Sequence, residues 1–105
     1  LFDKVAAAAD EYADELAERA VQLGGKAMGG IAEVGKHANA HAPAVAANSN
    51  AYVKSLSAHL QASATQTREA IDESDALDDK VTADLFTEVS AGLDKWQWMV
   101  SAQLQ

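Results

Sequence analysis

Apolar residues recur at steps of three and four along three long stretches of the chain, and this spacing constrains the fold more than any other feature. Residues spaced in this way line one face of an α-helix. In the first stretch, residues 1–23, that face holds Phe2, Val5, Ala9, Tyr12, Leu16, Ala20 and Leu23. Gly24 and Gly25 follow. We expect them to end the helix, because glycine readily adopts the left-handed conformation found at helix C-termini.

The second stretch predicts a helix from about residue 50 to Glu73. Asn48, Ser49 and Asn50 precede it and are favourable N-cap residues. Its apolar positions are Val53, Leu56, Leu60, Ala64 and Ile71. Because Ser, Thr and Gln are frequent in this stretch, only one narrow face of the helix can join a core.

The third stretch predicts a last helix that runs to near the C-terminus. An acidic connection, residues 75–79, leads into it, and either Asp79 or Thr82 can serve as its N-cap. The apolar stripe of this helix consists of Leu85, Val89, Leu93, Trp96 and Val100, with Phe86, Trp98 and Met99 on its flanks. We expect both tryptophans to pack in the core.

The middle of the chain predicts a loop over residues 24–30 and a short helix over 31–39, which Pro43 interrupts. No segment shows the strict alternation of a half-buried strand. The sequence therefore predicts one all-α domain over residues 1–105. A regular four-helix bundle needs one more long helix. Since the chain opens on what reads as the middle of a helix, we expect that missing first helix to lie upstream.

Composition narrows the possible classes of function. The chain has no cysteine, which excludes a disulfide scaffold or a cysteine zinc site. No apolar run approaches the roughly 20 residues of a membrane span. The formal net charge is −8, which repels nucleic acid and attracts cations. Much of the apolar content is alanine, so the monomer is expected to be marginally stable and oligomerisation would help it.

Four carboxylates on the first helix share one face. At roughly 100° per residue, with Asp3 at zero, Asp10 falls near −20°, Asp14 near 20° and Glu18 near 60°. Like charges four residues apart destabilise a helix unless a cation lies between them. Hard cations such as iron, manganese and calcium prefer these oxygen ligands. On spacing alone, a plain solvated face is the favoured explanation of the stripe.

The residues around this stripe resemble a known family. The run DELAERAVQLGG, residues 14–25, is similar to the D-x-x-A-E-R-x-x-x-L-G signature of the Dps (DNA-protection-during-starvation) mini-ferritins of the ferritin-like superfamily. Near the other end, TADLF at 82–86 and LDK at 93–95, followed by Trp98, resemble the last helix of that family. The two motifs together span most of the chain.

The resemblance implies a ferritin-like four-helix bundle, here lacking its first helix, with a short helix in the long middle connection. It implies a homo-oligomeric, dodecameric hollow cage that oxidises Fe(II), preferably with hydrogen peroxide, and stores ferric mineral. Such a protein is a ferroxidase that protects against oxidative damage. Iron is then the metal, and the expected location is the cytoplasm, with a possible association with the nucleoid.

The resemblance also assigns residues. The family's iron site lies between subunits, and its motif Asp and Glu correspond to Asp14 and Glu18. Asp3 matches a further carboxylate near that site, whereas Asp10 matches no family role. The family also uses histidines, one on the first bundle helix and one just before the position of Leu1. Neither is in this chain, so ferroxidase activity depends on ligands from upstream.

Other polar groups have plainer explanations. His37 and His41 are four residues apart and could share a metal if helical, but exposed loop histidines are the simpler interpretation. Arg19 is expected to form an ion pair rather than to take part in catalysis. A second acidic cluster surrounds the start of the last helix, where its dipole favours negative charge. In the family an acidic three-fold pore lies near here. The cluster consists of Asp72, Glu73, Asp75, Asp78, Asp79 and Asp84.

Two alternatives to the ferroxidase remain open. One is a non-catalytic helical interaction module with solvated acidic faces. The other is a buffer that binds divalent cations without redox turnover. DNA binding, which the family often achieves through a lysine-rich tail, is not expected of this acidic chain, and neither is a membrane association.

Overall fold

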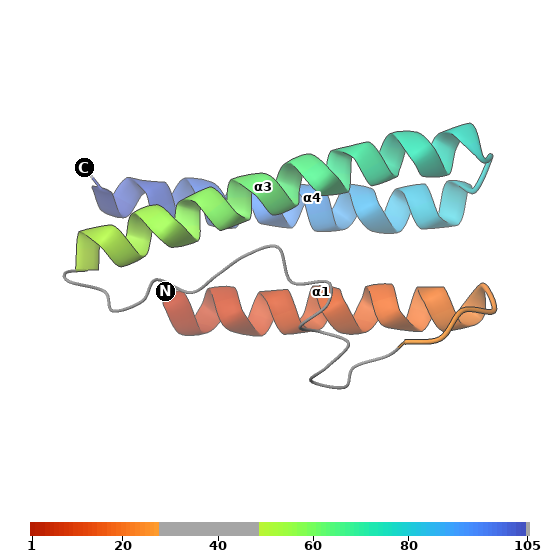
Figure 1. Ribbon diagram of the computed structural model, residues 1–105, viewed down its shortest axis with the longest axis horizontal. Coiled ribbons are helices and arrows are strands. Elements are labelled where there is room, and N and C mark those ends of the chain that lie inside the picture. The colour runs from red at the N-terminus through yellow and green to blue at the C-terminus, as the bar shows by residue number, and fades with distance from the viewer. Residues whose placement is uncertain (28–48, 105) are drawn as a thin grey trace. The chain divides into compact units, whose positions relative to one another are not determined.

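The computed structural model describes residues 1–27 and 49–104, and all regular structure in these ranges is helical. The elements are α1 (Phe2–Gln22), α3 (Ser49–Ala76), α4 (Lys80–Ser101) and a 3-10 turn, η1 (Ala102–Leu104) (Figure 1). The all-α prediction is confirmed for these residues. The short helix predicted over 31–39 lies outside them, as do His37 and His41. The chain forms two compact units, residues 1–41 and 42–105, which are described separately.

The first unit is built on α1, whose bounds agree with the predicted helix to within a residue at each end. Its C-terminus has the two hydrogen bonds of a Schellman motif. Gly25 N donates to Ala20 O at 2.8 Å, and Gly24 N donates to Val21 O at 3.0 Å. Gly24 has a φ of 93°, which only glycine adopts at little cost. The Gly-Gly stop predicted from the sequence is therefore confirmed.

The predicted apolar face of α1 is only partly buried. Val5 is the one buried residue of this helix, whereas Phe2 is 40% exposed and Leu23 is 58% exposed. Half-buried residues continue the face of Val5 along the helix, at Ala8, Tyr12, Leu16 and Arg19. The helix thus has one shielded side, and the ends of its predicted stripe are open to solvent.

The second unit is an antiparallel hairpin in which α3 and α4 lie side by side along most of their length (Figure 1). The buried residues of the two helices recur mostly at steps of three, four and seven, which is the spacing of one helical face, and we call these two rows the seam. The buried members on α3 are Val53, Leu60, Ala64, Thr67 and Ser74, and those on α4 are Ala83, Val89, Ser90, Leu93 and Val100. Many of these side chains are small, which allows the two helices to approach closely.

The turn between α3 and α4 is shorter than the sequence predicted. Helix α3 continues through Asp75 to Ala76, so the acidic connection is reduced to residues 77–79. Asp79 N donates to Ser74 O at 2.9 Å and Asp78 N donates to Asp75 O at 3.0 Å, a second Schellman motif. Asp78 takes the left-handed position with a φ of 61°. The prediction ended α3 too early because no glycine marks this stop.

The N-cap of α4 is Asp79, one of the two residues that the sequence offered. Its carboxylate accepts a hydrogen bond from the backbone N of Thr82 at 3.1 Å.

The prediction that both tryptophans pack in the core is correct only in part. Trp96 is half-buried, but Trp98 is 69% exposed and does not pack in the core of this chain. Trp98 is two residues further along α4, so it points away from the side that carries Trp96.

Candidate functional site

The carboxylates of α1 form a stripe along one exposed side of the helix. Asp3, Asp10, Asp14 and Glu18 are all exposed. We call these four residues the carboxylate stripe. Its regular spacing follows from α1 being an uninterrupted helix from Phe2 to Gln22. All four oxygen-bearing side chains are therefore accessible to a cation from solvent.

The stripe faces away from the shielded side of its own helix. At 100° per residue, Val5, Ala8, Tyr12, Leu16 and Arg19 all lie within about 40° of the direction opposite Asp3. They include Val5, the buried residue of α1, and most of its half-buried residues; Glu15 and Ala17 are also half-buried but lie outside this sector. A cation held by the stripe therefore lies on the open side of the helix, where a second molecule can approach it.

The helix brings some of the predicted ligands together and keeps others apart. Asp14 and Glu18 are one turn apart, about 6 Å along the axis, so their side chains can reach one ion. Asp10 is equally close to Asp14 on the other side. Asp3 is eleven residues before Asp14, about 16 Å along the axis at 1.5 Å per residue. Asp3 and Asp14 of the same chain therefore cannot share one ion.

Within residues 1–27 and 49–104, no group of three or more His, Asp or Glu side chains is arranged to hold a metal. The predicted pair His37 and His41 falls outside these residues. His59, the histidine that the structure describes, is half-buried on α3. Asp14 and Glu18 are therefore at most a partial ligand set.

A shallow hollow lies beside Glu18 at the C-terminal end of α1. It is lined by Ala17, Glu18, Val21, Gln22 and Ala27, so its surface is mostly apolar next to a carboxylate. The sequence interpretation missed it. Its signal was present, however, because Val21 is 18 residues after Asp3, five whole turns, and so lies on the face of the carboxylate stripe.

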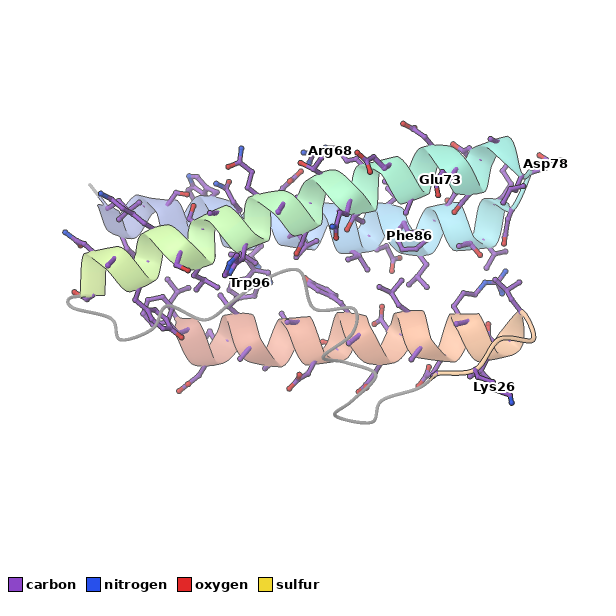
Figure 2. The ribbon with its side chains drawn as sticks, viewed as in Figure 1. Lys26, Arg68, Glu73, Asp78, Phe86 and Trp96 are labelled. Atoms are coloured by element: carbon purple, nitrogen blue, oxygen red, sulfur yellow. The ribbon has the colours of Figure 1, made fainter. Side chains whose placement is uncertain are left out.

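The second acidic cluster is spread around the α3–α4 turn. Glu73 and Asp78 lie at this end of the hairpin (Figure 2). Asp79 is half-buried and caps α4, whereas the other members of the cluster are exposed. For Asp79, the simpler explanation is therefore confirmed: the residue lies at the N-terminus of a helix, where the helix dipole favours negative charge. The exposed members are Asp72, Glu73, Asp75, Asp78 and Asp84.

Arg19, the basic residue of the motif, is half-buried in the last turns of α1. Its guanidinium donates a hydrogen bond to the Gln22 side-chain oxygen at 3.2 Å. A positive charge at this end of a helix is favoured by the helix dipole. The structure thus gives Arg19 a role in the helix end, and the ion pair expected of it stays a prediction.

Comparison with known proteins places this chain in a family. The ferritin-like domain family matches the chain over residues 1–105. A DNA protection during starvation protein from Agrobacterium fabrum (strain C58 / ATCC 33970) is 36% identical over 106 residues, covering 100% of this chain and 65% of the relative. A protein of the same name from Brevibacillus brevis is 28% identical over 104 residues, covering 99% of this chain and 70% of the relative. The chain thus spans about two thirds of the length of these relatives.

A solved structure agrees with these sequence matches. The crystal structure of Dps from Staphylococcus aureus matches with a TM-score of 0.92 and 28% sequence identity, covering 99% of this chain and 70% of that one. The family match, the two relatives and the fold all agree with the motif at residues 14–25. This chain therefore belongs to the ferritin-like domain family, and within it to the Dps-like mini-ferritins.

Proposed function

We propose that this protein oxidises Fe(II) and stores the ferric product in a homo-oligomeric cage, with Asp14 and Glu18 as iron ligands. The observation that supports this most is the exposed pair of carboxylates, one turn apart, on the open side of α1. Membership in the Dps-like mini-ferritins makes iron the expected cation. A merely solvated acidic face does not require an aspartate and a glutamate at the two motif positions held by Asp14 and Glu18.

A second copy of the chain contributes a further ligand to the site in this proposal. Asp3 is too far from Asp14 along α1 to share an ion with it in one molecule. Two α1 helices that meet along their open sides in antiparallel fashion bring Asp3 of one chain to Asp14 and Glu18 of the other. A two-fold axis between them repeats the arrangement, so each pair of chains holds two equivalent sites.

Iron is the substrate and cargo of this reaction. The Asp14 and Glu18 carboxylates attract and bind Fe(II), and their hard oxygen atoms favour the Fe(III) product. With hydrogen peroxide as oxidant, two Fe(II) ions lose one electron each. The peroxide accepts both electrons with two protons and gives two waters. Transfer in pairs avoids release of a hydroxyl radical, which suits protection against oxidative damage.

The small side chains of the core support the proposal that the chain assembles into an oligomer. The core of the described residues holds valine, leucine and alanine with no large aromatic side chain fully buried. A core of this kind contributes little stabilisation per residue, and burial between subunits adds to it. The dodecamer that the family resemblance implies is part of the proposal, with the exposed acidic residues near the α3–α4 turn as a path for iron. None of the helices in the described residues is long and apolar enough to cross a membrane. A cytoplasmic location is part of the proposal.

The test is Fe(II) oxidation by the full-length protein with added hydrogen peroxide, followed as loss of ferrous iron and of peroxide. The variant Asp14→Asn/Glu18→Gln keeps the size of both side chains and removes their charge. We expect its rate to fall roughly tenfold or more, as loss of metal-site groups commonly does. Asp10→Asn is the matched control, because it removes one charge from the same stripe and should leave the rate nearly unchanged.

Each other outcome identifies a competing function. Iron binding without peroxide consumption in the unaltered protein would indicate a divalent-cation buffer. Equally small effects of Asp14→Asn/Glu18→Gln and of Asp10→Asn would indicate a merely solvated face, and hence an interaction module. Light scattering on the native protein adds an independent check, since a monomer or dimer would contradict the cage.

A further inference from the structure

The seam between α3 and α4 contains polar residues at positions where its repeat predicts apolar ones. On α3 the repeat passes through Val53, Ser57 and Leu60, and on α4 it passes through Leu93, Gln97 and Val100. Ser57 and Gln97 are half-buried at these positions. They face each other near the end of the hairpin that is remote from the turn, which we call the open end.

Three side chains form a hydrogen-bonded layer at this end. Ser57 Oγ and Ser101 Oγ are 2.9 Å apart, and one hydroxyl donates to the other. Gln97 Nε2 donates to Ser101 Oγ at 3.1 Å and, more weakly, to Ser57 Oγ at 3.4 Å. The layer therefore joins α3 to the last turn of α4 by direct bonds between side chains.

Other hydroxyls in the seam behave differently. Thr67 Oγ1 donates to Ser63 O at 2.7 Å, and Ser74 Oγ donates to Ala70 O at 2.7 Å. Both acceptors lie one turn back on the same helix, so these bonds satisfy the hydroxyls without reaching α4. Unlike these two hydroxyls, those of Ser57 and Ser101 form a bond that crosses from α3 to α4.

The two ends of the hairpin need different means of closure. At the turn, residues 77–79 hold the helices together covalently and through the Schellman and N-cap bonds. Ser57 is twenty residues before the turn, about 30 Å away at 1.5 Å per residue. At that distance the turn constrains the helices weakly. A polar layer between two packed helices is a known means of specifying how the helices pair.

We propose that Ser57, Gln97 and Ser101 form a polar clasp that closes the open end of the hairpin and holds the last turn of α4 and η1 on α3. The location of η1 agrees with this, since it contacts both α3 and α4. Val100 is fully buried beside Ser101, so the clasp also keeps an apolar anchor in place. Opening of the clasp releases residues 98–104 while the rest of the hairpin stays paired.

The test is amide hydrogen exchange on the full-length protein, resolved by segment. We expect Ser57→Ala to speed exchange of residues 98–104 roughly fivefold, the effect of losing about one net hydrogen bond. Residues 83–90, near the turn, should keep their rates. Ser63→Ala is the matched control, because it removes an exposed serine hydroxyl from the same helix. Ser57→Thr retains a hydroxyl and should restore the protection.

The clasp also predicts coupling between its members. Ser57→Ala combined with Ser101→Ala should speed exchange by less than the product of the two single effects, because both substitutions remove the same Ser57–Ser101 bond. Unchanged exchange in residues 98–104, or an even increase along all of α4, would overturn the proposal. If Ser57→Ala does not fold, Ser101→Ala alone provides the same comparison.

Discussion

The Asp79 carboxylate accepts two hydrogen bonds from Thr82, one from the backbone N at 3.1 Å and one from the side-chain hydroxyl at 2.6 Å. One of these bonds satisfies a backbone donor that the first turn of α4 would otherwise leave without a helical partner. Asp79 also lies at the end of the turn, so the same residue stops one helix and starts the next.

Loss of this cap should destabilise the hairpin. Asp79→Ala removes both acceptor oxygens, and we expect the free energy of unfolding to fall by about 1 kcal/mol. Denaturant unfolding measures the change. Asp75→Ala is the control, since its side chain is exposed and it lies within α3. An equal loss in both variants would mean that the charge around the turn matters and the cap does not.

The left-handed residue of each Schellman motif is Gly24 in one and Asp78 in the other. Replacing the glycine and introducing one should therefore change the unfolding free energy in opposite directions. Asp78 carries a side chain in the left-handed region, whereas Gly24 does not. Asp78→Gly should therefore raise the unfolding free energy by about 0.5–1 kcal/mol, and Gly24→Ala should lower it by about 1 kcal/mol. Thermal unfolding of both variants checks this. A loss of stability in Asp78→Gly would show that its carboxylate stabilises the turn by more than the backbone strain costs.

The carboxylate stripe should destabilise the metal-free protein. Asp14 has an acidic neighbour four residues away on each side, Asp10 and Glu18. Asp14→Asn removes both repulsions and should raise the unfolding free energy by about 0.5 kcal/mol at low salt. Added divalent cation should stabilise the unaltered protein more than this variant. If the cation stabilises both proteins equally, it binds elsewhere.

The ion pair between α3 and α4 should matter little. Arg68 Nη1 and Asp94 Oδ1 are 3.3 Å apart, but both side chains are more than half exposed. Arg68, labelled in Figure 2, also donates a bond to the Thr65 hydroxyl. Asp94→Asn should cost at most about 0.5 kcal/mol, and the cost should shrink in high salt. A salt-independent loss well above this value would indicate a structural role beyond the pair.

Most of the fold was predictable from apolar spacing and from residues that start or stop helices. Gly24 and Asp79 marked two of these points correctly. The end of α3 was misplaced because Asp78 takes a conformation that usually calls for glycine. Trp98 was expected in the core on the basis of residue type, but its place on the flank of the α4 stripe leaves it exposed. The bonds of Ser57 and Gln97 were not predictable, since serine and glutamine in a helix look like surface residues.

The candidate site was predictable to a different extent. The shared face of Asp14 and Glu18 follows from spacing alone, but spacing does not distinguish a ligand pair from a solvated face. Their assignment to iron came from the resemblance in residues 14–25. The structure adds the direction of the stripe, away from the shielded side of α1. The spacing already placed Val5, Tyr12 and Leu16 opposite Asp3, and the structure shows that these three side chains are among the shielded ones.

The measurement that tests the central claim most directly is complementation between two inactive variants. Asp3→Asn and Asp14→Asn/Glu18→Gln are co-expressed, and peroxide-driven Fe(II) oxidation by the mixed assembly is compared with each variant alone. If Asp3 of one chain serves Asp14 and Glu18 of another, a mixed pair contains one intact site. Random two-fold pairing then restores about a quarter of the unaltered rate. A mixed assembly no more active than the average of the two separate variants would contradict a site shared between chains.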